Sequence, residues 1–177
     1  GYAEDSYLPS DFDVTEKVHA GVNTISVRVY RFTSGSFLEC QDYWRMTGIT
    51  RDVYLWSAPK TRIDDFFFRT TALKEANTTA EAALTVSVSG NNMKKTTLEA
   101  QLLDGDRVLA TQAVPVTASG EIELGFPTVT GITAWSAEQP QLYDLVITLN
   151  QKGKAVDTRV LKVGFRTVGV REDGALL

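Results

Sequence analysis

Apolar and polar residues alternate along most of this chain with a period of two. The clearest alternation lies at residues 80–89, where the apolar positions are Ala80, Ala82, Leu84, Val86 and Val88. Polar side chains or alanine occupy the positions between them. Because successive side chains of a strand point to opposite faces of a sheet, this segment is predicted to be a strand with one buried and one solvated face.

Six more segments have a strand pattern. The predicted strands are residues 61–70, 97–102, 107–114, 121–126, 142–150 and 155–163. Turn residues such as Asp104-Gly105-Asp106 separate them. About a quarter of the chain is valine, isoleucine or threonine, which favours an all-β fold. Seven strands divided by turns are the number expected of an immunoglobulin-like β-sandwich.

The predicted sandwich has no disulfide between its sheets, because Cys40 is the only cysteine. Its core must therefore be stabilised by apolar packing alone. Tyr143 begins the sixth predicted strand. Its hydroxyl fits the side-chain-to-backbone corner typical of such sandwiches, although an ordinary half-buried tyrosine is the commoner outcome. We assign Tyr143 no function on this basis.

The first part of the chain has a different pattern. Asp13 to Glu16 resemble a helix start, and Gly21 would end that turn in the left-handed region. Two strands are predicted, at residues 23–31 and 51–56. So few strands are not stable by themselves in water, so we expect partner strands upstream of this chain.

The same segment is expected to expose an apolar face and a free strand edge, which invite pairing with another copy. Pro59 marks the expected boundary with the following unit. A chain that begins near Ala58 would then be a monomer in size-exclusion chromatography.

Composition excludes several kinds of partner. Eighteen lysine and arginine residues oppose 22 aspartate and glutamate residues, which gives a net charge of −4. A chain without a basic excess is not expected to bind nucleic acid or an anionic membrane surface. No apolar run is long enough to cross a bilayer, and the first residues lack the pattern of a secretory signal.

Few residues have the type and spacing that catalysis needs. His19 is the only histidine, and a solvated turn residue is favoured over a catalytic base because no serine or cysteine lies at a recognisable spacing. One histidine and one cysteine do not make a zinc site, and no glycine-rich nucleotide-binding motif occurs. Acidic residues come close together at Glu4-Asp5, Asp11 and Asp13, Asp64-Asp65, and Asp104 and Asp106. Solvation explains all of them except Asp5, the candidate functional residue.

Residues 37–49 form an aromatic-rich stretch that is too long and irregular for a hairpin. Irregular segments this apolar usually pack against something. A binding loop around Trp44 and a contact between domains both fit. The composition favours the contact, because the aromatic residues are not interleaved with a matching set of acceptors for a sugar or a base.

Several strings of residues resemble bacterial β-galactosidases of glycoside hydrolase family 2. They are EDSYLPSDFD at residues 4–13, GVNTISVRV at 21–29, QDYWRMTGITRDV at 41–53, WSAEQPQLY at 135–143 and GFR at 164–166. Together they span nearly the whole chain in the family's order. Cys40, Thr47 and Thr50 depart from the family pattern, and Thr50 replaces an aromatic residue that would anchor a subunit contact.

Enzymes of this family consist of an N-terminal jelly-roll sugar-binding domain, an immunoglobulin-like sandwich and a (β/α)8 barrel that carries catalysis. The resemblance implies that residues 1–57 are the end of the jelly roll, 58–163 the sandwich and 164–177 the start of the connection to the barrel. The fold class is then all-β, an immunoglobulin-like β-sandwich preceded by a partial jelly-roll β-sandwich. The missing jelly-roll strands and the barrel would be its partners within one longer polypeptide.

The same resemblance implies that the longer protein hydrolyses terminal β-D-galactosides with retention, through two glutamates of the barrel. This chain would be a non-catalytic scaffold, inactive by itself and without a metal or cofactor of its own. Asp5 matches the aspartate that contacts galactose and helps to bind a monovalent cation in the complete enzyme. Mg²⁺ and a homo-oligomeric assembly are further expectations for that enzyme.

Two alternatives stay open. A stand-alone carbohydrate-binding or adhesive module would bind galactosides through Trp44. A β-glucuronidase or β-mannosidase of the same family would share the sandwich but act on a different sugar. The strings Glu4-Asp5-Ser6 and Trp44-Arg45-Met46 favour galactose.

Overall fold

The computed structural model describes residues 1–4, 8–38, 47–49, 51–170 and 172–175. The chain forms two compact units, Gly1–Trp56 and Ser57–Leu177. Asp5, Cys40 and Trp44 lie outside the described residues.

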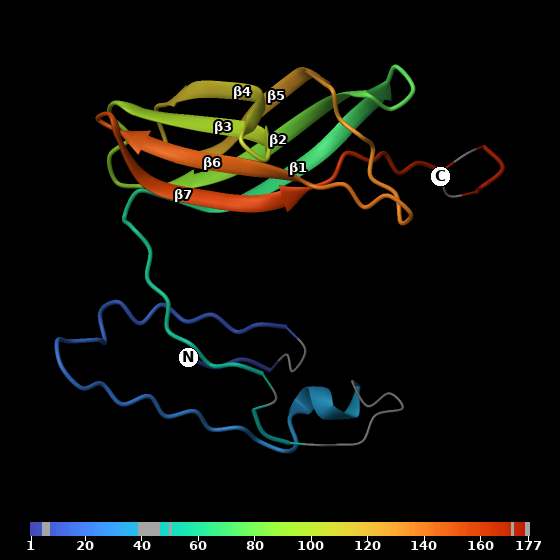
Figure 1. The fold of residues 1–177 in the computed structure, drawn as a ribbon. Helices are drawn as coiled ribbons and strands as arrows, with labels where there is room; N and C mark the ends of the chain where they lie inside the picture. The colour runs from blue at the N-terminus through green and yellow to red at the C-terminus, as the bar shows by residue number, and fades with distance from the viewer. Residues whose placement is uncertain (5–7, 39–46, 50, 171, 176–177) are drawn as a thin grey trace. The chain divides into compact units, whose positions relative to one another are not determined.

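The second unit contains all seven predicted strands. They are β1 (Arg62–Lys74), β2 (Thr79–Ser89), β3 (Thr96–Asp104), β4 (Arg107–Val116), β5 (Gly120–Thr130), β6 (Tyr143–Gln151) and β7 (Lys154–Val163), shown in Figure 1. β1 is longer than predicted and continues to Lys74. The all-β fold class is therefore confirmed.

The strands form two antiparallel sheets that pack face to face (Figure 1). One sheet has the strand order β1-β2-β5 and the other the order β4-β3-β6-β7. In the constant-type immunoglobulin domain the fourth strand belongs to the sheet of the first two. Here β4 pairs with β3 instead, because a tight turn between Asp104 and Arg107 joins them as a hairpin. The unit is thus immunoglobulin-like in architecture, with a four-stranded and a three-stranded sheet.

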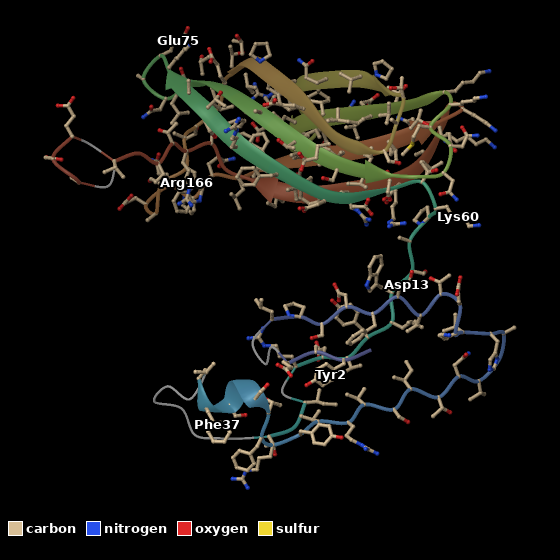
Figure 2. The ribbon with its side chains drawn as sticks, turned by 180° about the vertical axis from the view of Figure 1, so that it is seen from behind. Tyr2, Asp13, Phe37, Lys60, Glu75 and Arg166 are labelled. Atoms are coloured by element: carbon tan, nitrogen blue, oxygen red, sulfur yellow. The ribbon has the colours of Figure 1, made fainter. Side chains whose placement is uncertain are left out.

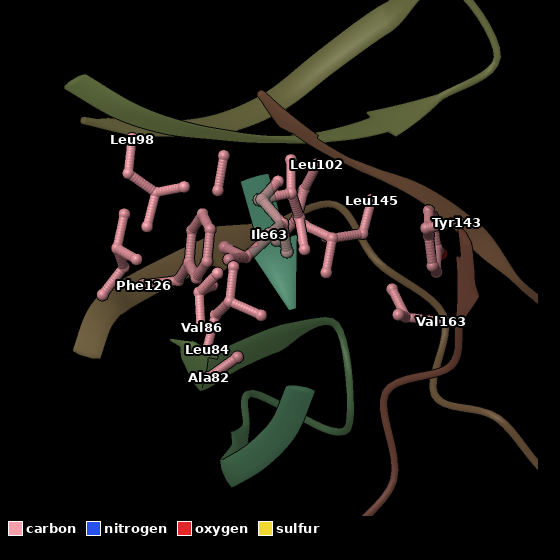
Figure 3. Packing of buried hydrophobic residues seen from close by; sticks show 14 of the residues in the cluster. Ile63, Ala82, Leu84, Val86, Leu98, Leu102, Phe126, Tyr143, Leu145 and Val163 are labelled. Atoms are coloured by element: carbon pink, nitrogen blue, oxygen red, sulfur yellow. The ribbon is translucent and has the colours of Figure 1, made fainter. Parts of the chain in front are cut away.

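The core lies between the two sheets and is built from the alternating apolar positions (Figure 3). The predicted inward residues of β2 are all buried, and Leu84 and Val86 have no exposed surface. Facing them from the other sheet are Leu98, Ala100, Leu102, Leu145, Ile147 and Leu149, also fully buried. Burying each large side chain contributes about 1.5–3 kcal/mol. Apolar packing therefore stabilises this unit, as expected.

Tyr143 forms the side-chain-to-backbone corner, which the sequence predicted to be a less common outcome than an ordinary half-buried tyrosine. Only 2% of its surface is exposed. Its ring lies 5.4 Å from the ring of Phe165, centroid to centroid. Its hydroxyl oxygen accepts the backbone N–H of Thr133 at 2.7 Å. The prediction of an ordinary half-buried tyrosine was wrong, because the segment after β5 folds back over the start of β6 and buries the ring.

The first unit differs more from the prediction. Residues 23–31 and 51–56 have no strand partner among the described residues, so the two predicted strands are not formed. An extended segment needs a neighbour for its backbone N–H and C=O groups before it becomes part of a sheet. The apolar side chains of Ile25, Val27 and Leu55 are more than half exposed, which agrees with the expected exposed face.

Local elements of the first unit are short. The backbone N–H of Thr15 donates to Asp13 Oδ1 at 2.9 Å, and that of Lys17 donates to the carbonyl of Val14 at 2.8 Å. Gly21 has a φ of 97°, in the left-handed region as predicted. The predicted helix start is therefore a single turn. The unit's described helix is the 3-10 helix η1 (Ser34–Phe37).

Candidate functional site

Glu4, the residue before Asp5, accepts hydrogen bonds from two hydroxyl groups. Tyr2 Oη donates to Glu4 Oε1 at 2.6 Å, and Ser34 Oγ donates to Glu4 Oε2 at 3.0 Å. These two hydrogen bonds, the one from Tyr2 more than the one from Ser34, lower the pKa of the exposed Glu4 carboxyl below its usual 4.5. The bond to Glu4 is also the main reason that the pKa of Tyr2 is raised. Figure 2 labels Tyr2 within the first unit.

Ser34 is placed by the start of η1. The backbone N–H of Thr33 donates to Ser36 Oγ at 2.9 Å, which closes the first turn of the helix. Glu4 therefore ties the segment that leads into Asp5 to a turn 30 residues further along the chain. Sequence reasoning missed this contact, because serine and glutamate at such a distance give no pattern.

His19 lies in an exposed turn, as predicted. Asn23 holds the turn, since its Nδ2 donates to the carbonyl of His19 at 2.7 Å and its Oδ1 accepts the backbone N–H of His19 at 3.0 Å. The imidazole Nδ1 lies 3.0 Å from the carbonyl oxygen of Ala20. These local contacts build a turn and give the histidine no nucleophile to activate.

Three residues of the acidic pairs in the second unit have structural partners. Asp64 is 2.7 Å from Arg62, and Asp104 is 3.0 Å from Arg107. Asp65 Oδ1 accepts the backbone N–H of Phe66 at 2.8 Å. Ion pairs and a backbone contact therefore accompany the solvation that the sequence suggested.

Within the described ranges, no group of three or more His, Cys, Asp or Glu side chains is placed to hold a metal ion. Asp5 lies outside the described residues, so the monovalent-cation and Mg²⁺ expectations stay predictions. No described helix is long and apolar enough to cross a membrane.

A small hollow lies where the chain leaves the sandwich. Its volume is about 230 Å³, and Trp135, Leu142, Gly164 and Arg166 line it. The guanidinium of Arg166 stacks over the Trp135 ring at 4.9 Å from the centroid. The Trp135 backbone N–H donates to the carbonyl of Phe165 at 2.8 Å. The hollow has an apolar wall and a cationic rim but lacks a nucleophile or an acid-base pair among these lining residues.

This hollow joins two of the strings singled out in the sequence. Trp135 and Leu142 come from one string, and Gly164 and Arg166 from the other. Figure 2 places Arg166 at the end of the sandwich where Glu75 lies, opposite the end where the chain enters at Lys60. The sequence singled out both strings but not their contact, which arises from the packing of the loop after β5 against the residues after β7.

The aromatic-rich stretch falls largely outside the described residues. Phe37 and Ile49, at its two ends, are exposed. Neither the binding loop around Trp44 nor the contact between domains is tested, so both stay predictions.

Comparison with known sequences gives two family matches. The profile described as "Glycosyl hydrolases family 2" matches residues 61–166, and the one described as "Glycosyl hydrolases family 2, sugar binding domain" matches residues 1–59. A β-galactosidase of Clostridium acetobutylicum is 38% identical over 94% of this chain, and one of Priestia megaterium is 38% identical over 97%. The chain spans only 18% and 17% of the length of these two proteins.

Solved structures share the fold. A β-glucuronidase of Bifidobacterium dentium, complexed with coumarin-3-O-glucuronide, has a TM-score of 0.59 and 20% identity, with 67% of this chain and 20% of that chain covered. A family 2 glycosyl hydrolase of Bacteroides cellulosilyticus has the same score and identity over 68% of this chain and 17% of its own. Both family profiles and the β-galactosidase relatives agree, and we conclude that this chain belongs to glycosyl hydrolase family 2.

Proposed function

We propose that this chain is the non-catalytic β-sandwich part of a β-galactosidase that hydrolyses terminal β-D-galactosides with retention of configuration. The observation that carries the proposal is its 38% identity to β-galactosidases over nearly the whole chain. The β-glucuronidase structure supports only the fold, because its identity to this chain is 20%. Galactose is therefore favoured over glucuronic acid as the sugar.

The proposed role of the sandwich is to space the sugar-binding domain from the catalytic barrel. Supporting this role, the chain enters the sandwich near Lys60 and leaves it near Arg166, at opposite ends (Figure 2). A rise of about 3.3 Å per residue makes strands of this length span roughly 30 Å or more. The tightly packed core between these ends makes the spacer stiff. Residues 1–57 would belong to the sugar-binding domain, and residues 164–177 would lead to the barrel.

The reactive groups are assigned to the barrel. A retaining glycosidase needs two carboxyl groups about 5 Å apart, one of them with a raised pKa. In this proposal two barrel glutamates have these roles, and Asp5 contacts the galactose and a monovalent cation in the complete enzyme. The tether of Glu4 to Ser34, at 3.0 Å, would fix the position from which Asp5 departs.

A segment exchange tests this function. The 177 residues replace the matching segment of the Clostridium acetobutylicum β-galactosidase, and hydrolysis of nitrophenyl β-D-galactoside and β-D-glucuronide is measured. We expect galactoside turnover by the hybrid and none by the 177-residue chain alone. The matched control inserts the equivalent segment of the Bifidobacterium dentium β-glucuronidase, which should give a much less active hybrid. A soluble, folded hybrid of this chain without galactosidase activity would contradict the proposal.

The stand-alone sugar-binding module is the second candidate, since the profile that matches residues 1–59 is described as a sugar binding domain. Calorimetric titration of the 177-residue chain with methyl β-D-galactoside separates the two. The scaffold proposal expects no saturable heat. Saturable binding that Trp44→Ala removes and Tyr54→Phe leaves unchanged would favour the binding module.

A further inference from the structure

Among the described strands, β1, β4, β5 and β7 each have one neighbour and therefore a free edge. Proteins protect such edges with proline or with charged side chains. β4 contains Pro115 and β5 contains Pro127, and β7 carries several charged residues along its length. The middle of β1, from Phe66 to Thr71, has neither a proline nor more than one charge.

Hydrogen bonds show which backbone groups of β1 face this edge. The N–H of Ile63 donates to Asp157 Oδ2 at 2.9 Å, and its carbonyl accepts from Arg159 at 3.2 Å, both on β7 rather than β2. The register of β1 against β2 shifts by one residue between Ile63 and Asp65. Beyond this shift, the N–H of Phe66 donates to Asp65 Oδ1. Because backbone groups alternate between the two sides of a strand, those of Phe68 face the same edge as those of Phe66.

The side chains beside this edge are self-complementary. Phe67 is 64% exposed and points to the outer face, while Phe66 and Phe68 pack against the core. Asp65 and Arg69 lie two positions before and two positions after Phe67, so they share its face. An antiparallel pairing centred on Phe67 sets Phe67 against its own copy. The same pairing sets Asp65 against Arg69 of the second copy, twice.

We propose that β1 pairs with β1 of a second copy of this chain, antiparallel and in the register centred on Phe67. The two three-stranded sheets then become one continuous sheet of six strands. Phe66 and Phe68 of opposite copies exchange backbone hydrogen bonds, for which the Phe66 N–H leaves its acceptor Asp65 Oδ1 and frees that carboxylate for Arg69 of the second copy. Phe67 forms the closer, non-hydrogen-bonded pair on the symmetry axis. Opposite charges directly across such a pair favour this register over its neighbours.

The predicted association is weak and depends on concentration. One short strand pair buries far less surface than a stable dimer needs, so dimers should appear only at high protein concentration. Arg69 is also 3.7 Å from Glu123 of its own chain, which lies on β5 beyond β2. Its guanidinium must leave Glu123 and turn towards the free edge of β1 to reach the second copy's Asp65, which weakens the association further.

Charge exchange tests the register. Sedimentation velocity over a wide concentration range measures dimerisation of the full chain, with a thermal unfolding curve to show that each variant is folded. Asp65→Arg and Arg69→Asp should each weaken the dimer about tenfold, because two attractive pairs become repulsive, and the double variant should restore it. Glu121→Lys, a charge reversal on β5 of the same sheet, is the control and should change nothing.

A disulfide across the symmetry axis gives an independent test. In a Cys40→Ser background, Phe67→Cys should form a disulfide-linked dimer under mild oxidation, because a non-hydrogen-bonded pair brings the two Cα atoms to about 4.5 Å, within disulfide range. Thr85→Cys, beside Phe67 on β2, should not. A chain that stays monomeric, a dimer indifferent to the charge reversals, or equal cross-linking at both cysteines would overturn the proposal.

Discussion

The hydroxyl oxygen of Tyr143 accepts the backbone N–H of Thr133 at a distance of 2.7 Å. Tyr143 is the first residue of β6, and Thr133 belongs to the segment that follows β5. The bond therefore fastens a loop to the four-stranded sheet at the end of the sandwich that also holds the Trp135 and Arg166 stack. The same end of the molecule contains the two sequence strings that match the family in this unit.

Removing this hydroxyl should destabilise the second unit. Tyr143→Phe keeps the buried ring but leaves the N–H of Thr133 without its acceptor, which costs about 1–3 kcal/mol in the free energy of unfolding. Urea denaturation monitored by circular dichroism measures the loss. Tyr54→Phe changes an exposed tyrosine and is expected to have no effect. An unchanged midpoint for Tyr143→Phe would mean that water replaces the hydroxyl without cost.

Asp157 and Arg159 should hold the start of β1. Asp157 accepts the N–H of Ile63 and lies 3.1 Å from Arg159, and only 8% of its side chain is exposed. Asp157→Ala leaves the backbone N–H of Ile63 unpaired and removes the carboxylate partner of Arg159, whose guanidinium keeps its bond to the Ile63 carbonyl. We expect a loss of about 1–3 kcal/mol and faster hydrogen exchange of the Ile63 amide.

The control for that variant is Asp144→Ala, which breaks a more exposed ion pair with Lys162. Surface pairs of this kind contribute about 0–1 kcal/mol, so the unfolding free energy should change little. If both variants destabilise equally, or if exchange at Ile63 stays slow in Asp157→Ala, the contact with β7 does not anchor β1.

A side chain at Gly164 should crowd Trp135. A Cβ at this position would lie 3.0 Å from Cβ and Cδ1 of Trp135, a contact so tight that the tryptophan must shift slightly. Gly164→Ala must therefore displace the indole, at a cost of about 1–3 kcal/mol, and should change the tryptophan fluorescence. Gly125→Ala on β5 meets no atom within 4 Å and serves as the matched control. We expect that variant to be neutral or stabilising by up to about 1 kcal/mol.

The Glu4 contact should weaken in acid. Hydrogen bonds from Tyr2 and Ser34 hold the folded-state pKa of Glu4 below its usual 4.5. A carboxyl with a lowered pKa stabilises the folded contact above its unfolded pKa, and that stabilisation is lost as the pH falls through the lowered value. An NMR titration of the Glu4 carboxyl carbon measures this pKa. Tyr2→Phe should raise the pKa towards 4.5, and more than Ser34→Ala does, because the bond from Tyr2 is the larger cause.

Tyr54→Phe is the control for the titration and should leave the Glu4 pKa unchanged. A Glu4 pKa at its ordinary value in the unmodified chain would show that the two hydroxyl contacts do not persist in solution.

Within the second unit, the sequence was sufficient to locate the strands. Alternation at residues 80–89 predicted which side chains of β2 face the core, and all of them are buried. The predicted turn at Asp104-Gly105-Asp106, where Gly105 has a positive φ, correctly separated two neighbouring strands. These features are local, since the face of a side chain and the conformation of a turn depend on residues next to each other in the chain.

The same pattern was insufficient in the first unit. Ile25, Val27 and Val29 alternate as regularly as the core residues of β2, yet no strand forms there among the described residues. The alternation of apolar and polar residues predicts which face a strand would bury. A strand also needs a neighbouring strand whose backbone groups bond its own N–H and C=O groups. Asp5 is the one site residue that the family resemblance supplied. It lies outside the described residues, so its role stays a prediction.

By itself, the sequence determined the all-β class, the strand segments of the second unit and the family. Only the tertiary structure decided that β4 joins the sheet of β3, that Tyr143 is buried against Phe165, and that Arg166 stacks on Trp135. The two ring contacts depend on packing between residues that lie far apart in the chain, whereas β4 joins β3 through a tight turn. The free energy of such contacts comes from shared burial and hydrogen bonding, which no local pattern records.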